Sequence, residues 1–363
     1  MLETALEVLN IIERHKFECY LVGGFVRDFY LGIESKDVDI CTNAKSKDLL
    51  ELFPNAKIPK ELYGAVTLFF KDVRFEITTF RKEIKYENRK PIEIEYTNSF
   101  IEDVKRRDFT INSLCMNSKG EIIDILNGKE DIDKKIIRCI NDPNVSLKED
   151  PLRILRAIRF SAQLDFELDK NLYKGIKQNK KYLDILSYNR IKSEINKILA
   201  SKNVKKGIDL IRKLSLNKQL KLYDLNKLSY INDIIGYWAQ IDKENVYEYT
   251  SIEKKNIKQI REIMKTKKIT NFELYNYGLY ICLLGAQILN IDKEKIINMY
   301  KELPVKSKNE INITAEEIST LLKKDLGSWL KPIYDDLTNK ILNKKIENDN
   351  EILKKYIKDK YMI

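Results

Sequence analysis

The alternation of apolar and polar residues divides the chain into a mixed N-terminal part and a helical remainder. Apolar residues recur at helical spacing over residues 1–17, which predicts an amphipathic helix. Shorter apolar or alternating runs predict strands over residues 18–22, 37–41, 65–70, 74–80, 92–96 and 121–125. The polar stretch 82–91 between two of these strands predicts a mobile loop.

Further along, the periodicity changes. A helix is predicted to begin near Glu102 and to run past Leu114, and after Pro151 the strand signal stops. We therefore predict an α+β protein, in which an N-terminal mixed α/β head is followed by an all-helical remainder with its own domains.

Composition favours a polyanionic partner. The 363 residues are 43% apolar, so each part of the chain can form a core, and 66 Lys and Arg against 55 Asp and Glu give a formal net charge of +11. This excess of positive charge suits nucleic acid. A general lysine-rich compositional bias is the alternative explanation.

The scarce residue types exclude several classes of chemistry. With a single histidine, His15, the chain lacks the material for histidine triads or histidine zinc sites. Its five scattered cysteines lack a C-x-x-C spacing, which predicts buried thiols in a reducing compartment. We expect neither a signal peptide nor a membrane span, because no long apolar run is present. These observations predict a cytoplasmic protein.

A glycine turn followed by two aspartates carries the clearest chemical signal. Gly23 and Gly24 follow the first predicted strand, and Arg27 lies on the short helix that they open. Backbone N–H groups approach a phosphate closely only where no Cβ intervenes, and a helix N-terminus favours an anion. Asp37 and Asp39 come next, two residues apart on a predicted strand, so their carboxylates project from one face about 6–7 Å apart.

Two carboxylates so close repel each other unless a cation lies between them. Mg²⁺ suits hard oxygen ligands beside phosphates. A phosphate cradle next to a two-carboxylate metal site predicts phosphoryl or nucleotidyl transfer, in which metal coordination replaces a histidine base. A simple turn and a surface Asp-x-Asp are the alternatives for each feature taken alone.

Two further stretches contain candidate site residues, and each of these residues could instead have a purely structural role. Glu76 lies between apolar residues on a predicted strand, where it either completes the carboxylate set or faces solvent. Arg107, in Arg-Arg-Asp-Phe-Thr-Ile-Asn, presents a fork of donors that fits phosphate. A surface salt bridge is the alternative that this stretch favours when taken alone.

A second arginine-rich stretch follows at residues 149–160. Pro151 suits a first helical position, which makes Asp150 a natural N-cap, and spacing alone favours that structural role. Asp150 and Arg153 lie about one turn apart and could also present an acceptor and a donor fork to a base edge. Arg156 and Arg159 continue the line along an otherwise apolar helix, so they need anionic partners.

In this order, these motifs resemble the class II tRNA nucleotidyltransferases, the CCA-adding enzymes and their bacterial relatives that include poly(A) polymerases. The motif-bearing match covers about residues 18–200. The resemblance implies four parts: a catalytic nucleotidyltransferase head over 1–137, a base-recognising neck over 138–200, and a tRNA-binding helical body and tail over 201–300 and 301–363.

The resemblance also assigns roles to matching positions. It implies that Asp37 and Asp39 are metal ligands. Glu76 joins them in the predicted catalytic set on the strength of its place on the strand. The residues that it implies contact the nucleotide are Gly23, Gly24, Arg27, Arg107, Asp150, Arg153, Arg156 and Arg159, with Asp150 and Arg153 reading the base. Residues 81–91, with Tyr86, Arg89 and Pro91, resemble the flexible loop of the CCA-adding members.

The function that follows is template-independent addition of CCA to the 3′ end of tRNA from CTP and ATP, with Mg²⁺ and release of pyrophosphate. The partners are tRNA, CTP and ATP, with no membrane and no protein partner. An enzyme that adds only A and a poly(A) polymerase are alternatives within the family. A catalytically silent RNA-binding protein is the alternative from another class.

Overall fold

The computed structural model describes residues 1–35, 37–59, 64–87 and 90–362, with the side chains of residues 83–94 left out. The chain forms two compact units, Met1–Lys221 and Leu222–Ile363, and each is described by itself.

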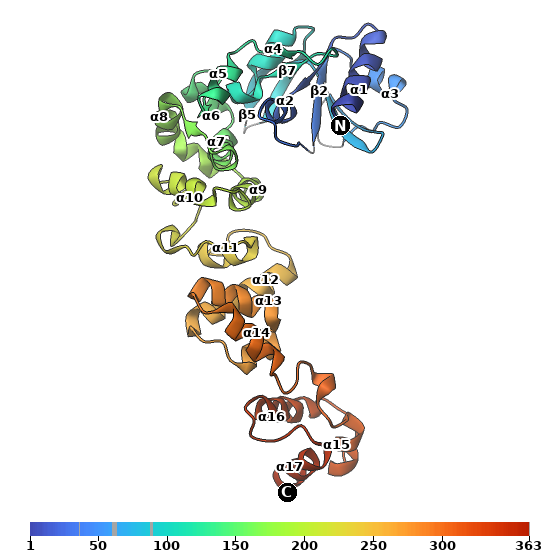
Figure 1. Ribbon diagram of the computed structural model, residues 1–363, viewed down its shortest axis with the longest axis vertical. Coiled ribbons are helices and arrows are strands. Elements are labelled where there is room, and N and C mark those ends of the chain that lie inside the picture. Colours follow the sequence, from blue (N-terminus) through green and yellow to red (C-terminus); the bar gives the residue numbers. More distant parts are fainter. Residues whose placement is uncertain (36, 60–63, 88–89, 363) are drawn as a thin grey trace. The chain divides into compact units, whose positions relative to one another are not determined.

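The first unit is built on a six-stranded sheet with the strand order β3-β4-β2-β1-β7-β8 (Figure 1). Its strands are β1 (Cys19–Val22), β2 (Val38–Thr42), β3 (Ala65–Phe70), β4 (Val73–Thr79), β7 (Cys115–Met116) and β8 (Ile122–Ile123). All neighbouring strands are antiparallel except β2 and β4, which run parallel. The predicted strands are thus present, although β8 is shorter than expected.

Short helices connect and cover this sheet. They are α1 (Leu2–Arg14), α2 (Gly24–Tyr30), α3 (Ser46–Leu52) and α4 (Phe100–Lys105). In α4, Phe100 and Val104 pack against Val22 and Cys41, and the rings of Phe100 and Tyr20 stack with centroids 4.0 Å apart. Residues four apart share one face of a helix, so this spacing sets which side of α4 is buried.

The prediction of one helix from Glu102 past Leu114 is wrong. Helix α4 ends at Lys105, Phe109 adopts an extended conformation and pairs with Cys139 in an isolated bridge, and a 3₁₀ turn follows at Thr110–Asn112. The buried carboxylate of Asp108 accepts a hydrogen bond from the Phe109 backbone N–H at 2.9 Å, which stabilises the break. Tertiary pairing therefore overrides the helical periodicity of this segment.

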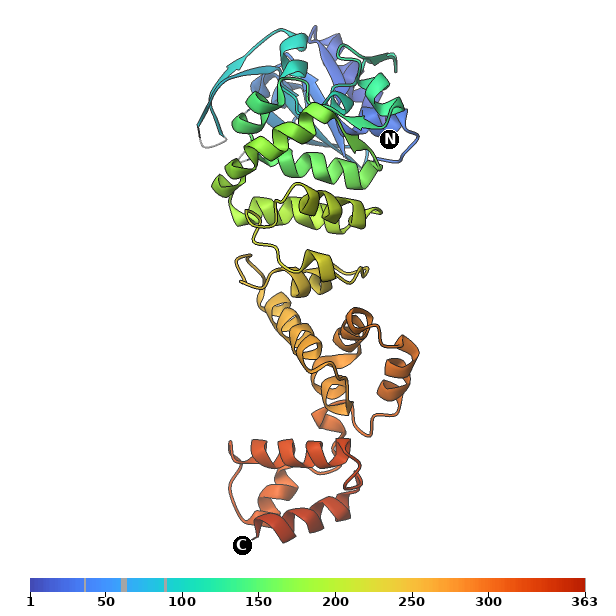
Figure 2. The ribbon, with the colours of Figure 1, turned by 90° about the vertical axis from the view of Figure 1, so that its left-hand side faces the viewer.

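The predicted loop over residues 82–91 is also wrong for its described part. Strands β5 (Arg81–Glu87) and β6 (Lys90–Tyr96) form an antiparallel hairpin that projects from the unit (Figure 2). Arg89, which the loop resemblance included, lies outside the described residues, as do the side chains of Tyr86 and Pro91. A polar two-stranded ribbon need not bury one face, so it lacks the alternation by which half-buried strands are predicted.

The rest of the first unit is mainly helical. Its elements are α5 (Gly128–Asp133), β9 (Ile136–Ile137), α6 (Pro143–Glu149), α7 (Leu152–Leu164), β10 (Glu167–Leu168), α8 (Lys170–Asn179), a 3₁₀ helix (Lys180–Ile185), α9 (Tyr188–Leu199) and α10 (Val204–Lys213). Strands β9 and β10 pair in parallel, so one short strand follows Pro151 against expectation.

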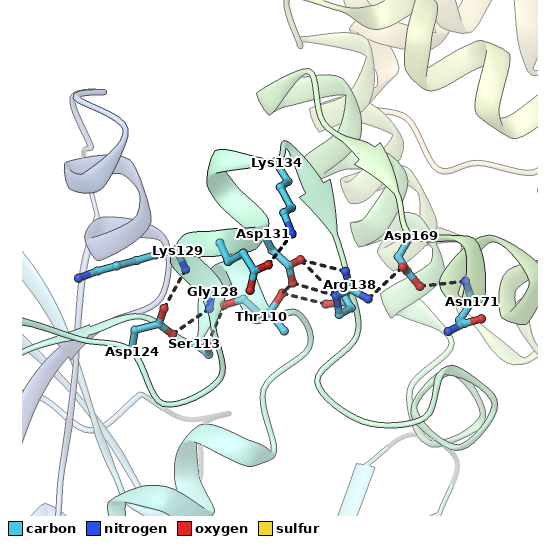
Figure 3. A network of polar contacts seen from close by, with 11 residues as sticks. Thr110, Ser113, Asp124, Gly128, Lys129, Asp131, Lys134, Arg138, Asp169 and Asn171 are labelled. Carbon is cyan, nitrogen blue, oxygen red and sulfur yellow. Dashed lines mark hydrogen bonds and ion pairs between the residues drawn. The ribbon is translucent and has the colours of Figure 1, made fainter.

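A polar network joins this helical region to the sheet region (Figure 3). Arg138 contacts the Asp131 carboxylate with Nε at 3.1 Å and the Asp169 carboxylate with Nη1 at 3.1 Å. Thr110 Oγ1 donates to Asp131 at 2.6 Å, and Asp169 caps α8 by accepting from the Asn171 N–H. Buried Asp131 thus connects the 3₁₀ turn to the neighbouring helices.

The described residues of the second unit form helices joined by loops and turns, with no strand among them. It contains α11 (Ile234–Ile241), α12 (Ser251–Thr266), α13 (Asn271–Leu289), α14 (Lys293–Lys301), α15 (Ala315–Leu322), α16 (Leu330–Leu342) and α17 (Asn350–Tyr361), with 3₁₀ turns at Leu225–Lys227 and Lys308–Glu310. Capping boxes at Thr250, Thr270 and Thr314 fix three helix starts. A mixed head and a mostly helical remainder confirm the predicted fold class.

All five cysteines are buried free thiols. Burial raises the pKa of Cys115, Cys139 and Cys282 to about 12. Across the described chain, none of the helices combines the length and apolar character needed to cross a membrane.

Candidate active site

A polar cavity of about 850 Å³ in the first unit collects nearly all the predicted site residues. Among the described residues that line it, eight are Arg or Lys and six are Asp or Glu. The predicted ones are Gly23, Gly24, Arg27, Asp37, Asp39, Arg107, Asp150, Arg153, Arg156 and Arg159. Only Glu76 of the predicted set is missing from this described lining. Dense charge of both signs suits a polyanion that binds together with a cation.

The glycine turn lies close to the candidate site residues Asp39 and Arg107. Gly23 is the N-cap of α2 with φ of +71° and ψ of −134°, a conformation that essentially only glycine adopts. A Cβ at this position would lie 3.6 Å from Asp39 Oδ2 and 3.7 Å from Arg107 Nη1. The bare backbone therefore separates a carboxylate from a guanidinium without a side chain between them.

Asp37 and Asp39 reach the cavity from the start of β2. The strand begins at Val38, one residue later than predicted, so Asp37 immediately precedes it. Burial raises the pKa of Asp39 to about 6, and the negative charges of Glu76 and Asp37 add to this, against the opposing effects of Arg107 and Arg156. A nearby cation would stabilise the ionised form of Asp39.

Glu76 lies on β4 beside Asp39, because the parallel register of β2 and β4 pairs these two residues. Nowhere in the described chain does a group of three His, Cys, Asp or Glu side chains come together in a way that could hold a metal ion. Asp37 and Asp39 both line the cavity and are the candidate pair of carboxylate donors. One or two carboxylates plus substrate phosphates is how proteins commonly bind Mg²⁺.

The Arg-Arg-Asp-Phe-Thr-Ile-Asn segment links the glycine turn to α7. Arg27 Nη1 donates to Asn112 Oδ1 at 2.6 Å, and Asn112 Nδ2 donates to Asp108 Oδ1 at 2.9 Å. Asp108 Oδ2 in turn accepts from Arg156 Nε at 2.6 Å. Burial acts to raise the pKa of Asp108, but Arg156 and the hydrogen bonds lower it below its ordinary value, so the carboxylate stays charged. Two cavity arginines are thus held by one continuous network.

Asp150 and Arg153 lie at the start of α7 and combine structural contacts with exposure to the cavity. Helix α7 begins at Leu152, one residue after the predicted start, and Asp150 Oδ1 accepts from the Leu152 N–H at 3.1 Å. Arg153 donates from Nη1 to Ser146 Oγ at 2.6 Å and from Nη2 to the Arg106 carbonyl at 3.0 Å. Pro151 is the N-cap of α7, so the predicted N-cap position of Asp150 is wrong by one residue. The Asp150 carboxylate still bonds to the first turn of the helix, which holds it at the cavity wall.

Arg159 has an acidic partner that the sequence did not reveal. Its Nη1 lies 3.1 Å from Glu194 Oε1 on α9, and Lys197 Nζ lies 3.3 Å from the same oxygen. Burial lowers the pKa of Arg159 to about 10, although Glu194 opposes this change. The guanidinium of Arg159 also lies 4.3 Å from the Phe160 ring centroid, and Arg27 approaches the same ring at 5.1 Å.

Sequence reasoning missed three cations of the cavity lining: Arg81, Arg106 and Lys197. The position of Arg106 could have been inferred from the sequence, because it is adjacent to Arg107 and both residues can pair with Asp103, three and four residues before them. Arg81 and Lys197 reach the cavity from the hairpin and from α9. No local spacing in the sequence indicates either placement.

Three family models match consecutive parts of the chain. The model described as Poly A polymerase head domain matches residues 19–138, and the model described as Probable RNA and SrmB- binding site of polymerase A matches residues 165–223. The model described as tRNA nucleotidyltransferase domain 2 matches 248–357.

Similar proteins span almost the full chain. A CCA-adding enzyme of Anoxybacillus flavithermus is 32% identical over 382 residues, which cover 97% of this chain and 96% of that protein. A CCA-adding enzyme of Ligilactobacillus salivarius is 32% identical over 383 residues, and the match covers 96% of this chain and 94% of that protein. The chain belongs to the CCA-adding enzyme family. The resemblance inferred from the motifs is confirmed.

The family assignment agrees with the fold. A crystal structure of the CCA-adding enzyme of Bacillus stearothermophilus in complex with CTP superimposes with a TM-score of 0.86 at 25% identity, covering 99% of this chain and 97% of that one. CCA-adding enzymes are tRNA nucleotidyltransferases, and metal dependence is typical of their family. The chain is therefore a nucleotidyltransferase, and its polar cavity is the candidate active site.

Proposed function

We propose that this protein extends the 3′ end of tRNA with C, C and A from CTP and ATP, and that the polar cavity performs every addition. One observation carries the proposal: a single cavity holds the glycine turn with Arg27, the pair Asp37 and Asp39, and the pair Asp150 and Arg153. These three groups match the triphosphate, the metal and the base of an incoming nucleotide.

The residues have separate roles in this scheme. Gly24 and Arg27 bind the triphosphate, Asp37 and Asp39 hold Mg²⁺, and Arg107 contacts the sugar or a phosphate. A metal held there would lower the pKa of the primer hydroxyl and neutralise negative charge on the leaving pyrophosphate. The chain itself aligns the nucleotide, because Asn112 holds Arg27 and Asp108 holds Arg156, two arginines of the cavity lining.

The neck supplies base recognition and further charge. Asp150 and Arg153 read the Watson–Crick edge of the incoming base, while Arg156 and Arg159 contact the nucleotide. Glu76 acts beside Asp39 and raises the negative charge that draws the cation. In this division the head spans 1–137, the neck 138–200, the body 201–300 and the tail 301–363, and the enzyme works in the cytoplasm.

Primer extension tests the function directly. We expect purified protein with Mg²⁺ to add two residues to tRNA lacking CCA when only CTP is present, and three with CTP and ATP. ATP alone should extend tRNA that already ends in CC by one residue. Extension by A only would favour an A-adding enzyme, and long tails would favour a poly(A) polymerase. No extension of any primer would identify a silent RNA-binding protein.

The helical second unit is proposed to bind the body of tRNA. Lys267, Lys268 and Lys295 surround a pocket of about 340 Å³ between α12, α13 and α14. Replacing these three lysines with alanine should weaken tRNA binding. The slope of log affinity against log salt should become shallower by about 0.7–0.9 for each phosphate that the protein no longer neutralises. CTP binding should not change.

Filter binding at four or more salt concentrations measures this slope, and isothermal titration with CTP checks the nucleotide site. Replacing the exposed Lys47, Lys57 and Lys119 of the head with alanine removes the same number of charges outside the second unit and serves as the control. An unchanged slope in the triple variant would show that these lysines only solvate their helices.

A further inference from the structure

Asp103 is a fully buried carboxylate that lies directly behind the candidate active site. It occupies α4 immediately before Val104, whose side chain packs into the core, and its exposure is 0%. It is not among the described residues that line the cavity. Burying a carboxylate is costly unless hydrogen bonds and opposite charges compensate, so its contacts indicate what it is for.

Within the described part of the chain, the hydrogen bonds that the Asp103 carboxylate accepts come from residues of the cavity lining. Its Oδ1 accepts from Arg106 Nε at 2.8 Å and, at 3.3 Å, from the backbone N–H of Arg81, the first residue of β5. Its Oδ2 accepts from Arg107 Nη2 at 2.9 Å. Arg81, Arg106 and Arg107 all line the cavity, so one hidden carboxylate orients three parts of its wall.

The charge of Asp103 persists in this environment. Burial acts to raise the pKa of Asp103, but the ion pairs with Arg106 and Arg107 lower it below its ordinary value. Arg107 and Asp39 both lie beside Gly23, where a Cβ would be 3.7 Å from Arg107 Nη1 and 3.6 Å from Asp39 Oδ2, and the charge of Arg107 acts on Asp39. Without Asp103, Arg107 would lose a close acidic partner and its charge would be more strongly attracted to Asp39.

Through Arg106, the position of Asp103 also affects Arg153 of the neck. Its side chain is held by Asp103, while its carbonyl oxygen accepts the hydrogen bond from Arg153 Nη2 at 3.0 Å. The position of the Arg106 backbone therefore helps to set the direction of the Arg153 guanidinium.

We propose that Asp103 is a positioning residue, which directs Arg107 to the nucleotide and keeps it from competing with the metal for Asp39. This inference rests on the proposed function of the cavity. It predicts two effects of removing the Asp103 charge: weaker binding of nucleotide and a higher requirement for Mg²⁺. A residue that only stabilised the fold would produce neither.

The variant Asp103→Asn keeps the size of the side chain and removes its charge. We expect CTP affinity, measured by isothermal titration in EDTA, to fall about 10-fold or more, as for loss of a charged hydrogen bond. In primer extension, the Mg²⁺ concentration at half-maximal rate should rise severalfold. Asp131→Asn is the matched control, because Asp131 is also buried in the head and paired with an arginine, Arg138, outside the cavity (Figure 3).

A second variant separates positioning from stability. Asp103→Asn combined with Arg106→Gln restores the net charge of the buried cluster, which favours folding if the single variant unfolds. Arg107 still lacks its acidic partner there, so weak CTP binding and a raised Mg²⁺ requirement should remain.

Normal CTP affinity and Mg²⁺ requirement in a folded variant, equal to those of Asp131→Asn, would overturn the inference. Such a result, with active wild-type protein, leaves the proposed function intact. Failure of the wild-type protein to extend any primer would instead overturn the proposed function.

Discussion

Replacing Asp37 or Asp39 with alanine is expected to lower nucleotide incorporation by ~10³-fold or more, because a bound metal contributes several kcal/mol of transition-state stabilisation. Both carboxylates open onto the cavity, and Asp39 lies beside Glu76 in the register of β2 and β4. The fold should survive, since removing one of several clustered negative charges relieves repulsion.

Single-turnover incorporation of CTP measures this loss, and filter binding shows whether tRNA affinity stays close to that of the wild type. Glu51→Ala, at an exposed position of α3, is a control for loss of a head carboxylate outside the site. If both aspartate variants turned over at near wild-type rates, the metal would have to be held elsewhere.

The second large effect concerns the choice of base. Replacing both Asp150 and Arg153 with alanine should reduce discrimination against UTP and GTP by about 10- to 100-fold, because each mispaired buried polar group costs about 1–3 kcal/mol. Incorporation of all four nucleotides by a folded enzyme, compared as kcat/KM, measures the change.

The capping contact of Asp150 provides the sharpest control. Serine also caps helices well, so Asp150→Ser should keep the hydrogen bond to the Leu152 N–H while it removes the carboxylate. Reduced discrimination in Asp150→Ser would assign the carboxylate to the base. Normal discrimination in Asp150→Ser, with damage only in Asp150→Ala, would mean that Asp150 is a cap and nothing more.

Ten of the candidate residues predicted from the sequence line one cavity, and they could be singled out because they lie next to strong local signals. Gly23 and Gly24 end a strand, Asp37 and Asp39 begin another, and Asp150 precedes a proline at a helix start. Each signal fixes a side chain relative to its own element. The order of the motifs then indicated the family. The family in turn implied that these elements lie around one cavity.

The errors arose where tertiary contacts decide the backbone. Helical periodicity continued through residues 106–109, but Phe109 pairs with Cys139, thirty residues later, and the helix ends. Asp103 escaped notice for the same reason. Its spacing to Arg106 and Arg107 is that of an ordinary exposed ion pair, and only the packing of Phe100 and Val104 on the sheet buries it.

The buried cysteines can be used to measure local opening of the structure. A protonated, inaccessible thiol resists alkylation, so each cysteine reacts only when its surroundings open. Cys282 reports on the second unit, whereas Cys19, Cys41, Cys115 and Cys139 report on the first. Cys41 and Cys115 lie in the core cluster that includes α4, near Arg107. The alkylation rates of these two thiols therefore measure how far a bound nucleotide rigidifies the head, without any engineered label.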